Sequence, residues 1–384
     1  MSLVPSMSFK MRALPKTVSP ALRITPSRAC LSILTLLGVL GCGTTGLHAQ
    51  LAPSPDAAPV SNAPAPKPDE DAEPVTTLKV NVDLVSLYFT VKNKDGTLIP
   101  HLGADNCAVQ EDKNPQKLKN FQAENNQPLT LGILLDTSAS QTRVLPLEQE
   151  FGSQFLQSVL KSKDEAFLVS FDVDVDLLQD YTNSPRQLER AMNKAEINTA
   201  GGNGSAGIPG IGQGPVPTQG APKGTLLYDA VYLAANEKLG RETGRKAIVL
   251  LTDGEDQGSR VKIAGAIEAA QKANVIIYGI LLADRGSYGN FGFGYNGNFA
   301  LKKMADETGG RMIDVGHDGK KLEAAFQQIE DELRTQYLAA YTPTNAKADG
   351  TYRKIAVECK SDKGDDLKVQ VKKGYYAIAS DSGK

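Results

Sequence analysis

Residues 129–140 read LTLGILLDTSAS, an apolar run that passes into a polar turn at Asp136. Runs of this kind are typical of strands that are buried on both faces of a sheet. Two further apolar runs, RKAIVLLT at 245–252 and VIIYGILLAD at 275–284, are separated from it by amphipathic segments of helical period. The alternation over residues 129–334 predicts an α/β domain with a doubly wound, mainly parallel sheet.

The two flanks of this domain have a different pattern. Residues 77–128 and 335–378 alternate apolar and polar side chains, which is typical of antiparallel strands. A turn is expected near Asn114-Pro115. Each flank is too short to bury a core by itself, so we expect the flanks to pair with each other. Whether they form one domain is left open by the sequence.

The N-terminal part of the chain has the pattern of an export signal. Residues 1–42 hold five basic residues and no acidic one, and the apolar run 29–41 ends at Cys42. The ending VLGC resembles a bacterial lipobox, so we predict that residues 1–42 are a lipoprotein-type signal peptide and that Cys42 is lipidated. Cleavage after Ala49 is the alternative, and it would release a soluble secreted form.

The residues after this signal predict a tether. Residues 43–76 are rich in Pro and Ala and are expected to be an extended linker, and residues 379–384 a short tail. A lipidated cysteine followed by a linker would hold a folded domain away from a membrane surface. We therefore expect an extracytoplasmic location, periplasmic or at the cell surface, with the lipid as the contact with the membrane.

Charge and composition exclude some classes of function. The 384 residues include 42 basic and 44 acidic ones, so removal of the basic signal leaves 37 basic residues against 44. A chain with this acidic excess has no electrostatic reason to bind nucleic acid. Three histidines leave little room for histidine-based chemistry. Cys107 and Cys359 remain after export, and a disulfide or two separately buried thiols are equally compatible with their surroundings.

Polar side chains follow two of the buried strands. Asp136, Ser138 and Ser140 come after the first, and Asp253 comes after the strand at 245–252. The carboxyl ends of parallel strands meet at one edge of a sheet, where ligands bind. Carboxylate and hydroxyl oxygens suit Mg²⁺ or Ca²⁺ and argue against zinc. Taken alone, these residues could equally be helix caps.

With Thr225 between the two segments, the order D-x-S-x-S, Thr, T-D-G resembles the metal-ion-dependent adhesion site (MIDAS) of the von Willebrand factor type A (VWA) domain. Over residues 77–378 the chain resembles the bacterial exported family called VWFA-related. The resemblance implies that Ser138 and Ser140 bind the metal directly and that Thr225 joins them when ligand is bound.

The same resemblance implies that Asp136 and Asp253 act mainly through ordered waters. Two carboxylates would neutralise the ion, and neutral hydroxyls would leave it electrophilic. An open coordination position would then take an Asp or Glu carboxylate from a protein partner. The expected cofactor is Mg²⁺, with Mn²⁺ or Ca²⁺ as alternatives.

Two Gly-rich stretches, 200–224 and 285–299, are expected to project from the same edge of the sheet, as flexible filler or as a rim that contacts the ligand. The candidate rim residues are Tyr288, Phe291, Phe293 and Tyr295. The G-x-G-x-x-G string that starts at Gly292 is displaced from its strand and does not predict a dinucleotide site. Residues 172–176, DVDVD, are expected to be the polar face of a strand and not a calcium loop.

Three functions are compatible with these features. The favoured one is a non-enzymatic adhesion or binding module that engages a protein through the metal. The alternative is a structural component of an envelope complex, in which the metal serves stability. The third is a metal-dependent hydrolase with Glu255 or Asp256 as its base, which is disfavoured because no nucleophile and base can be paired in the sequence.

Overall fold

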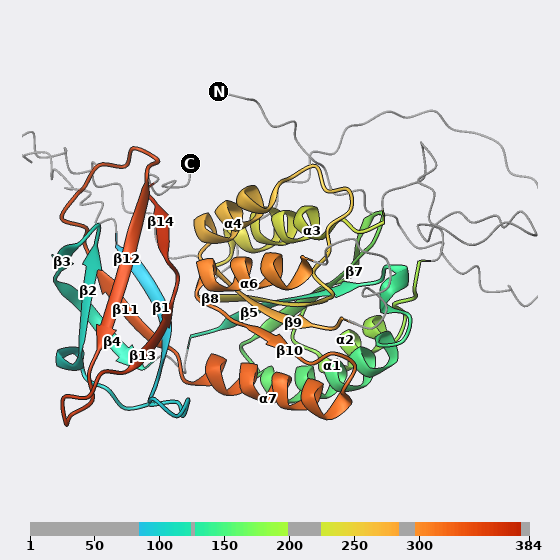
Figure 1. Cartoon of the computed structure of the whole chain (residues 1–384), viewed down its shortest axis with the longest axis horizontal. Coiled ribbons are helices and arrows are strands. Elements are labelled where there is room, and N and C mark those ends of the chain that lie inside the picture. The colour runs from blue at the N-terminus through green and yellow to red at the C-terminus, as the bar shows by residue number, and fades with distance from the viewer. Residues whose placement is uncertain (1–83, 124–126, 199–223, 284–295, 378–384) are drawn as a thin grey trace, which may run out of the picture. The chain divides into compact units, whose positions relative to one another are not determined.

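The computed structural model describes residues 84–123, 127–198, 224–283 and 296–377 (Figure 1). The predicted signal peptide with Cys42, the linker, the tail, most of the two Gly-rich stretches and all four candidate rim residues lie outside these ranges. None of the helices within the described ranges is both long and apolar enough to cross a membrane.

The described strands and helices follow in chain order. The strands are β1 (Val85–Lys92), β2 (Cys107–Glu111), β3 (Asn114–Gln116), β4 (Leu118–Ala123), β5 (Leu129–Asp136), β6 (Glu165–Phe171), β7 (Val175–Thr182), β8 (Arg245–Thr252), β9 (Val275–Leu281), β10 (Met312–Asp314), β11 (Tyr337–Tyr341), β12 (Tyr352–Cys359), β13 (Lys368–Val371) and β14 (Gly374–Tyr376). The α-helices are α1 (Leu145–Val159), α2 (Pro185–Met192), α3 (Leu227–Leu233), α4 (Ile263–Lys272), α6 (Gly297–Thr308) and α7 (Gly319–Arg334).

The α/β domain comprises β5 to β10 and the six helices. Its strands form a six-stranded sheet in the order β10-β9-β8-β5-β6-β7. All neighbours in it are parallel except β6 and β7, which are antiparallel. The predicted fold class, a doubly wound and mainly parallel sheet with antiparallel structure on its flanks, is confirmed.

Helices cover both faces of this sheet (Figure 1). Side chains alternate between the faces along a strand, so Leu131, Ile133 and Leu135 of β5 share one core with α1, α2 and α7. Leu134 of β5 points to the other core, which α3, α4 and α6 close. Burial on both sides explains why β5 is buried along its whole length and is mainly apolar up to Asp136.

The remaining strands form what we call the β-module, β1 to β4 and β11 to β14. It contains two four-stranded sheets, in the orders β13-β1-β11-β4 and β14-β12-β2-β3. Each sheet combines strands from both flanks: β1 pairs with β11, and β2 pairs with β12. A shared core lies between the sheets and includes Phe89, Val109, Tyr337 and Ile355.

A disulfide joins the two flanks within this core. Cys107 at the start of β2 is bonded to Cys359 at the end of β12, at a sequence separation of 252 residues. The two cysteines are also direct partners in the register of these antiparallel strands. Of the two alternatives that the sequence left open, a disulfide or two separately buried thiols, the structure contains the disulfide.

Two local predictions departed from the structure, the first of them by two residues. The turn expected near Asn114-Pro115 is present and is centred on Asp112 and Lys113, which have positive φ angles of 48° and 68°. This tight turn places Pro115 in β3, and β3 is an edge strand, where a missing backbone N–H costs little.

The expected strand over the DVDVD segment is the second error. Asp172 and Asp174 lie in the turn between β6 and β7, and β7 begins only at Val175. Asp172 is held there by structural hydrogen bonds, from the hydroxyl of Thr137 at 2.7 Å and from the amide of Asn198 at 2.9 Å. The segment closes a β-hairpin at the edge of the sheet.

Candidate metal site

Asp136 ends β5 at the carboxyl edge of the sheet and is completely buried. Its Oδ1 accepts hydrogen bonds from the backbone N of Ser138 at 3.0 Å and from the Ser138 hydroxyl at 2.5 Å. Its Oδ2 accepts from the Thr252 hydroxyl at 2.6 Å. Three donors therefore fix the orientation of this carboxylate.

The two serines extend the site toward the surface. Ser138 is 6% exposed, and its Oγ lies 3.0 Å from the Oγ of Ser140, which is exposed. A short 3-10 helix over Ala139–Gln141 turns the chain so that the hydroxyls of residues 138 and 140 meet. The result is a row of oxygens that runs from a buried carboxylate to an accessible hydroxyl.

The end of β8 supplies the second carboxylate. Asp253 is 2% exposed, and its Oδ1 accepts a hydrogen bond from the backbone N of Glu255 at 3.0 Å. Thr252 connects the two strand ends, because its hydroxyl donates to Asp136 and accepts from the backbone N of Gly254 at 3.0 Å. Burial and the neighbouring Asp253 carboxylate raise the pKa of Asp136 to about 7.

Gly254 is required by the close approach of another segment. Its φ is +81°, and a Cβ at this position would lie 2.3 Å from the carbonyl oxygen of Gly297. Gly297 begins α6, and Glu255 accepts hydrogen bonds from its backbone N at 2.8 Å and from that of Asn296 at 2.7 Å. The loop that carries Asp253 is thereby locked against the start of α6.

Thr225 lies two residues before α3 and is 6% exposed. Its backbone bridges to Gln257 and Gly258, in the loop that follows β8, and its hydroxyl donates to the carbonyl of Gly224 at 2.6 Å. The structure therefore places Thr225 beside the loop that begins with Asp253.

The two carboxylates that could serve as catalytic bases make structural contacts. Glu255 caps the start of α6, as described above. Asp256 accepts hydrogen bonds from the backbone N of Tyr228 at 3.2 Å and from the hydroxyl of Ser259. Both residues help to connect the loop after β8 with the helices beside it.

One acidic residue near the site was missed by the sequence interpretation. Glu148, in the first turns of α1, is completely buried, and neither of its carboxylate oxygens has a hydrogen-bond partner within the described part of the chain. Burial, with the charges of Asp136 and Asp253, raises the pKa of Glu148 well above its ordinary value. Its position on the apolar stripe of the helix, three residues after Leu145 and four before Gly152, was the available signal.

The donor set fits a hard divalent cation. It consists of carboxylate and hydroxyl oxygens, which Mg²⁺ and Ca²⁺ prefer. The unpaired carboxylate oxygens belong to Glu148, which is outside this set. Nowhere in the described ranges are three His, Cys, Asp or Glu side chains grouped so that they could hold a metal among themselves. A cation held here would therefore need the serine and threonine hydroxyls as well as the two carboxylates.

No protein-family model and no curated protein matches the chain. Among solved structures, it is similar to proximal thread matrix protein 1 from the mussel byssus, at 16% identity and a TM-score of 0.42 over 58% of this chain. The chain spans about half of that protein, 51% of its length. Another structure of the mussel protein is described as having a zinc-occupied MIDAS motif.

Two bacterial structures are also similar to the chain. One is BatB from Bacteroides thetaiotaomicron, at 18% identity and a TM-score of 0.37 over 54% of this chain and 99% of that one. The other is the vWF domain of the type V pili tip protein Mfa5 from Porphyromonas gingivalis, at 13% identity and a TM-score of 0.37 over 54% of this chain and 95% of that one. At these identities the likeness concerns the fold alone.

Proposed function

We propose that this chain is an exported, membrane-tethered binding module of the VWA type that engages a protein ligand through a divalent cation. The proposed ion is Mg²⁺, with Mn²⁺ or Ca²⁺ as alternatives. The ligand would supply an Asp or Glu carboxylate to the ion. The residues proposed to hold the ion are Asp136, Ser138, Ser140, Thr225 and Asp253.

The observation that carries this proposal is the graded exposure of the oxygen row. Asp136 is buried and fixed by three donors, Ser138 is nearly buried, and Ser140 is an exposed residue. An ion held along this row would keep one side toward solvent. A carboxylate from another protein could approach it from that side.

Electrostatics favour a cation at this place. Asp136 and Asp253 repel each other across a buried region, and this repulsion adds to the effect of burial in raising the pKa of Asp136. A divalent ion would remove that repulsion and stabilise both ionised carboxylates. Because the serine hydroxyls are neutral, the loaded site would carry little net negative charge and would still attract an anionic partner group.

Export is proposed from the N-terminal pattern, with Cys42 as the anchor. The Cys107–Cys359 disulfide supports it, because structural disulfides persist in oxidising compartments and are rare in the cytosol. An anchor followed by the linker 43–76 would present the binding site at a distance from the membrane.

Titration calorimetry of Mg²⁺ and Mn²⁺ into the chain, beside Asp136→Ala and Asp253→Ala, tests the proposal. We expect binding in the wild type and its loss in both variants. A pull-down in Mg²⁺ against chelator would then search for the partner. Should the wild type bind neither ion, even with an acidic peptide present, the proposal fails. If the ion binds and raises the stability of the chain, but the pull-down captures no partner, the alternative function is favoured. In that function the chain is a structural component of an envelope complex.

A further inference from the structure

Glu148 is a buried carboxylate for which the described part of the chain offers no donor. Its side chain is 0% exposed, and both Oε1 and Oε2 are without a hydrogen-bond partner there. Buried polar atoms are nearly always paired in folded proteins, so an exception of this size needs a reason. An unpaired buried acid is among the more unfavourable groups that a fold can hold.

The charges that act on Glu148 add to this cost. They are those of Asp136 and Asp253, the two carboxylates of the candidate site, and both are negative. Both carboxylates of the candidate site thus act on Glu148 from the carboxyl edge of the sheet. A positive charge placed there would favour the ionised form of Glu148.

A second unpaired oxygen lies on the same segment. Gln141 follows Ser140 directly and is 0% exposed. Its amide nitrogen lies 3.4 Å from the Ser140 hydroxyl, whereas its Oε1 has no partner in the described structure. Gln141 before α1 and Glu148 within α1 are therefore two buried residues with unused acceptor atoms.

We propose that Glu148 is a further acidic member of the cation site, which acts on the bound divalent ion through the water that the ion carries. The inference rests on the proposed function, since it assumes that an ion binds beside Asp136. The three carboxylates, all of them described residues, do not form a group that could hold an ion by itself, and we therefore place water between Glu148 and the ion. In this role Glu148 is a positioning residue, and it strengthens binding by charge and by orienting that water.

The proposal predicts opposite effects of one substitution in two conditions. In chelator, Glu148→Gln removes an unfavourable buried acid, so the thermal midpoint of the variant should equal or exceed that of the wild type. With Mg²⁺ or Mn²⁺, the variant should bind the ion about 10–100-fold more weakly, as is usual when a group that supports a metal site is lost. Its cation-induced rise in midpoint should shrink accordingly.

Glu150→Gln provides the matched control. It makes the same change of charge on the same helix, but Glu150 is exposed. Calorimetric affinity and thermal midpoints, each measured with and without chelator, should be those of the wild type. Glu148→Asp keeps the carboxylate and should recover part of the affinity that Glu148→Gln loses, which a merely structural role would not produce.

The outcomes separate this inference from the proposed function. If the wild type binds the ion, Asp136→Ala abolishes binding and Glu148→Gln binds like the wild type, the inference is overturned and the proposed function stands. A lower midpoint of Glu148→Gln in chelator, with unchanged affinity, would also overturn it and assign Glu148 to the fold. If the wild type binds no ion, both proposals fall together.

Discussion

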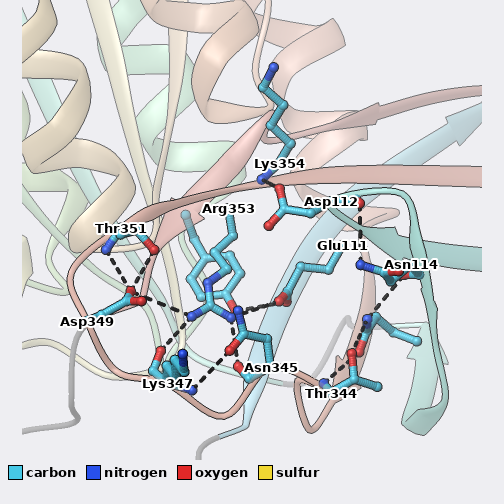
Figure 2. Close-up of polar contacts among 12 residues, drawn as sticks. Glu111, Asp112, Asn114, Thr344, Asn345, Lys347, Asp349, Thr351, Arg353 and Lys354 are labelled. Atoms are coloured by element: carbon cyan, nitrogen blue, oxygen red, sulfur yellow. Dashed lines mark hydrogen bonds and ion pairs between the residues drawn. The ribbon is translucent and has the colours of Figure 1, made fainter.

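Two buried glutamates in this molecule differ in their hydrogen bonding. Glu111 of the β-module is 2% exposed and accepts hydrogen bonds from the Tyr341 hydroxyl at 2.8 Å, the Tyr375 hydroxyl at 2.9 Å and Arg353 Nη1 at 3.2 Å. Glu148 of the α/β domain is at least as deeply buried and receives no such bond from the described residues (Figure 2 shows the environment of Glu111). Burial is the same in both cases, and the supply of donors differs.

The difference separates a structural group from one available to a ligand. The guanidinium of Arg353 also donates hydrogen bonds to the backbone carbonyls of Asn345 and Lys347 (Figure 2). The polar groups around Glu111 therefore find their hydrogen-bond partners within the chain. A closed cluster of this kind has no need of a further ion. Glu148, in contrast, is buried without a donor among the described residues.

Removal of Glu111 should have the largest effect. Glu111→Ala would leave the guanidinium of Arg353, which is 1% exposed, without its buried carboxylate. Breaking a buried pair in this way costs about 3–5 kcal/mol in the free energy of unfolding. Urea denaturation measures it, with the exposed Glu358→Ala of β12 as the control. A loss below about 1 kcal/mol would remove the contrast drawn with Glu148.

The disulfide should come next. Replacement of both Cys107 and Cys359 by Ala opens a loop that spans the whole α/β domain. We expect a loss of about 2–5 kcal/mol, from the added freedom of the unfolded chain. Denaturation with and without a reductant gives an independent measure, and identical urea midpoints in the two conditions would contradict the expectation.

The pH dependence of the metal-free protein sharpens the comparison further. Because the pKa of Asp136 is raised to about 7 in the folded state, the folded protein holds a proton that the unfolded chain releases near pH 4. The free energy of unfolding should therefore fall by about 4 kcal/mol as the pH rises from about 4 to about 7. Urea titrations in chelator measure the slope. Asp136→Asn should reduce it and leave the part that comes from the raised pKa of Glu148. A slope unchanged in that variant would speak against the buried repulsion.

Ser140→Ala should have the smallest effect on the fold. Ser140 is exposed, so the free energy of unfolding in chelator should change by less than about 0.5 kcal/mol. The affinity for Mg²⁺ should nevertheless fall about tenfold, because an oxygen ligand is lost. Calorimetry with Ser158→Ala of α1 as a control tests this. Equal losses in the two variants would show that Ser140 has no particular role at the ion.

The centre of the sheet could be predicted from the sequence because β5, β8 and β9 contain long apolar runs. Burial on both faces favours apolar side chains at successive positions, so these strands can be identified without knowing their partners. The turn after β2 was misplaced because Asn114-Pro115 is a common turn signal. The left-handed backbone of Asp112 and Lys113 is a property of the paired strands.

The candidate site could be predicted only in part, because only some of its residues stand at strand ends. Asp136 and Asp253 stand at strand ends, where position in the sequence predicts position in space. Glu148 reaches the same region from a helix, and its burial depends on how α1 packs against the sheet. The helical period alone placed it on the buried stripe, but whether a donor faces it is visible only once its described neighbours are known.

The disulfide also determines how mechanical force would pass through the molecule. A pull applied between residues 84 and 377 would follow the chain to Cys107, cross to Cys359 and leave through the last strands. The α/β domain lies entirely within the covalent loop and is bypassed by this path. A molecule held at both ends could therefore bear tension through its β-module while the six-stranded sheet stayed unloaded and kept its geometry.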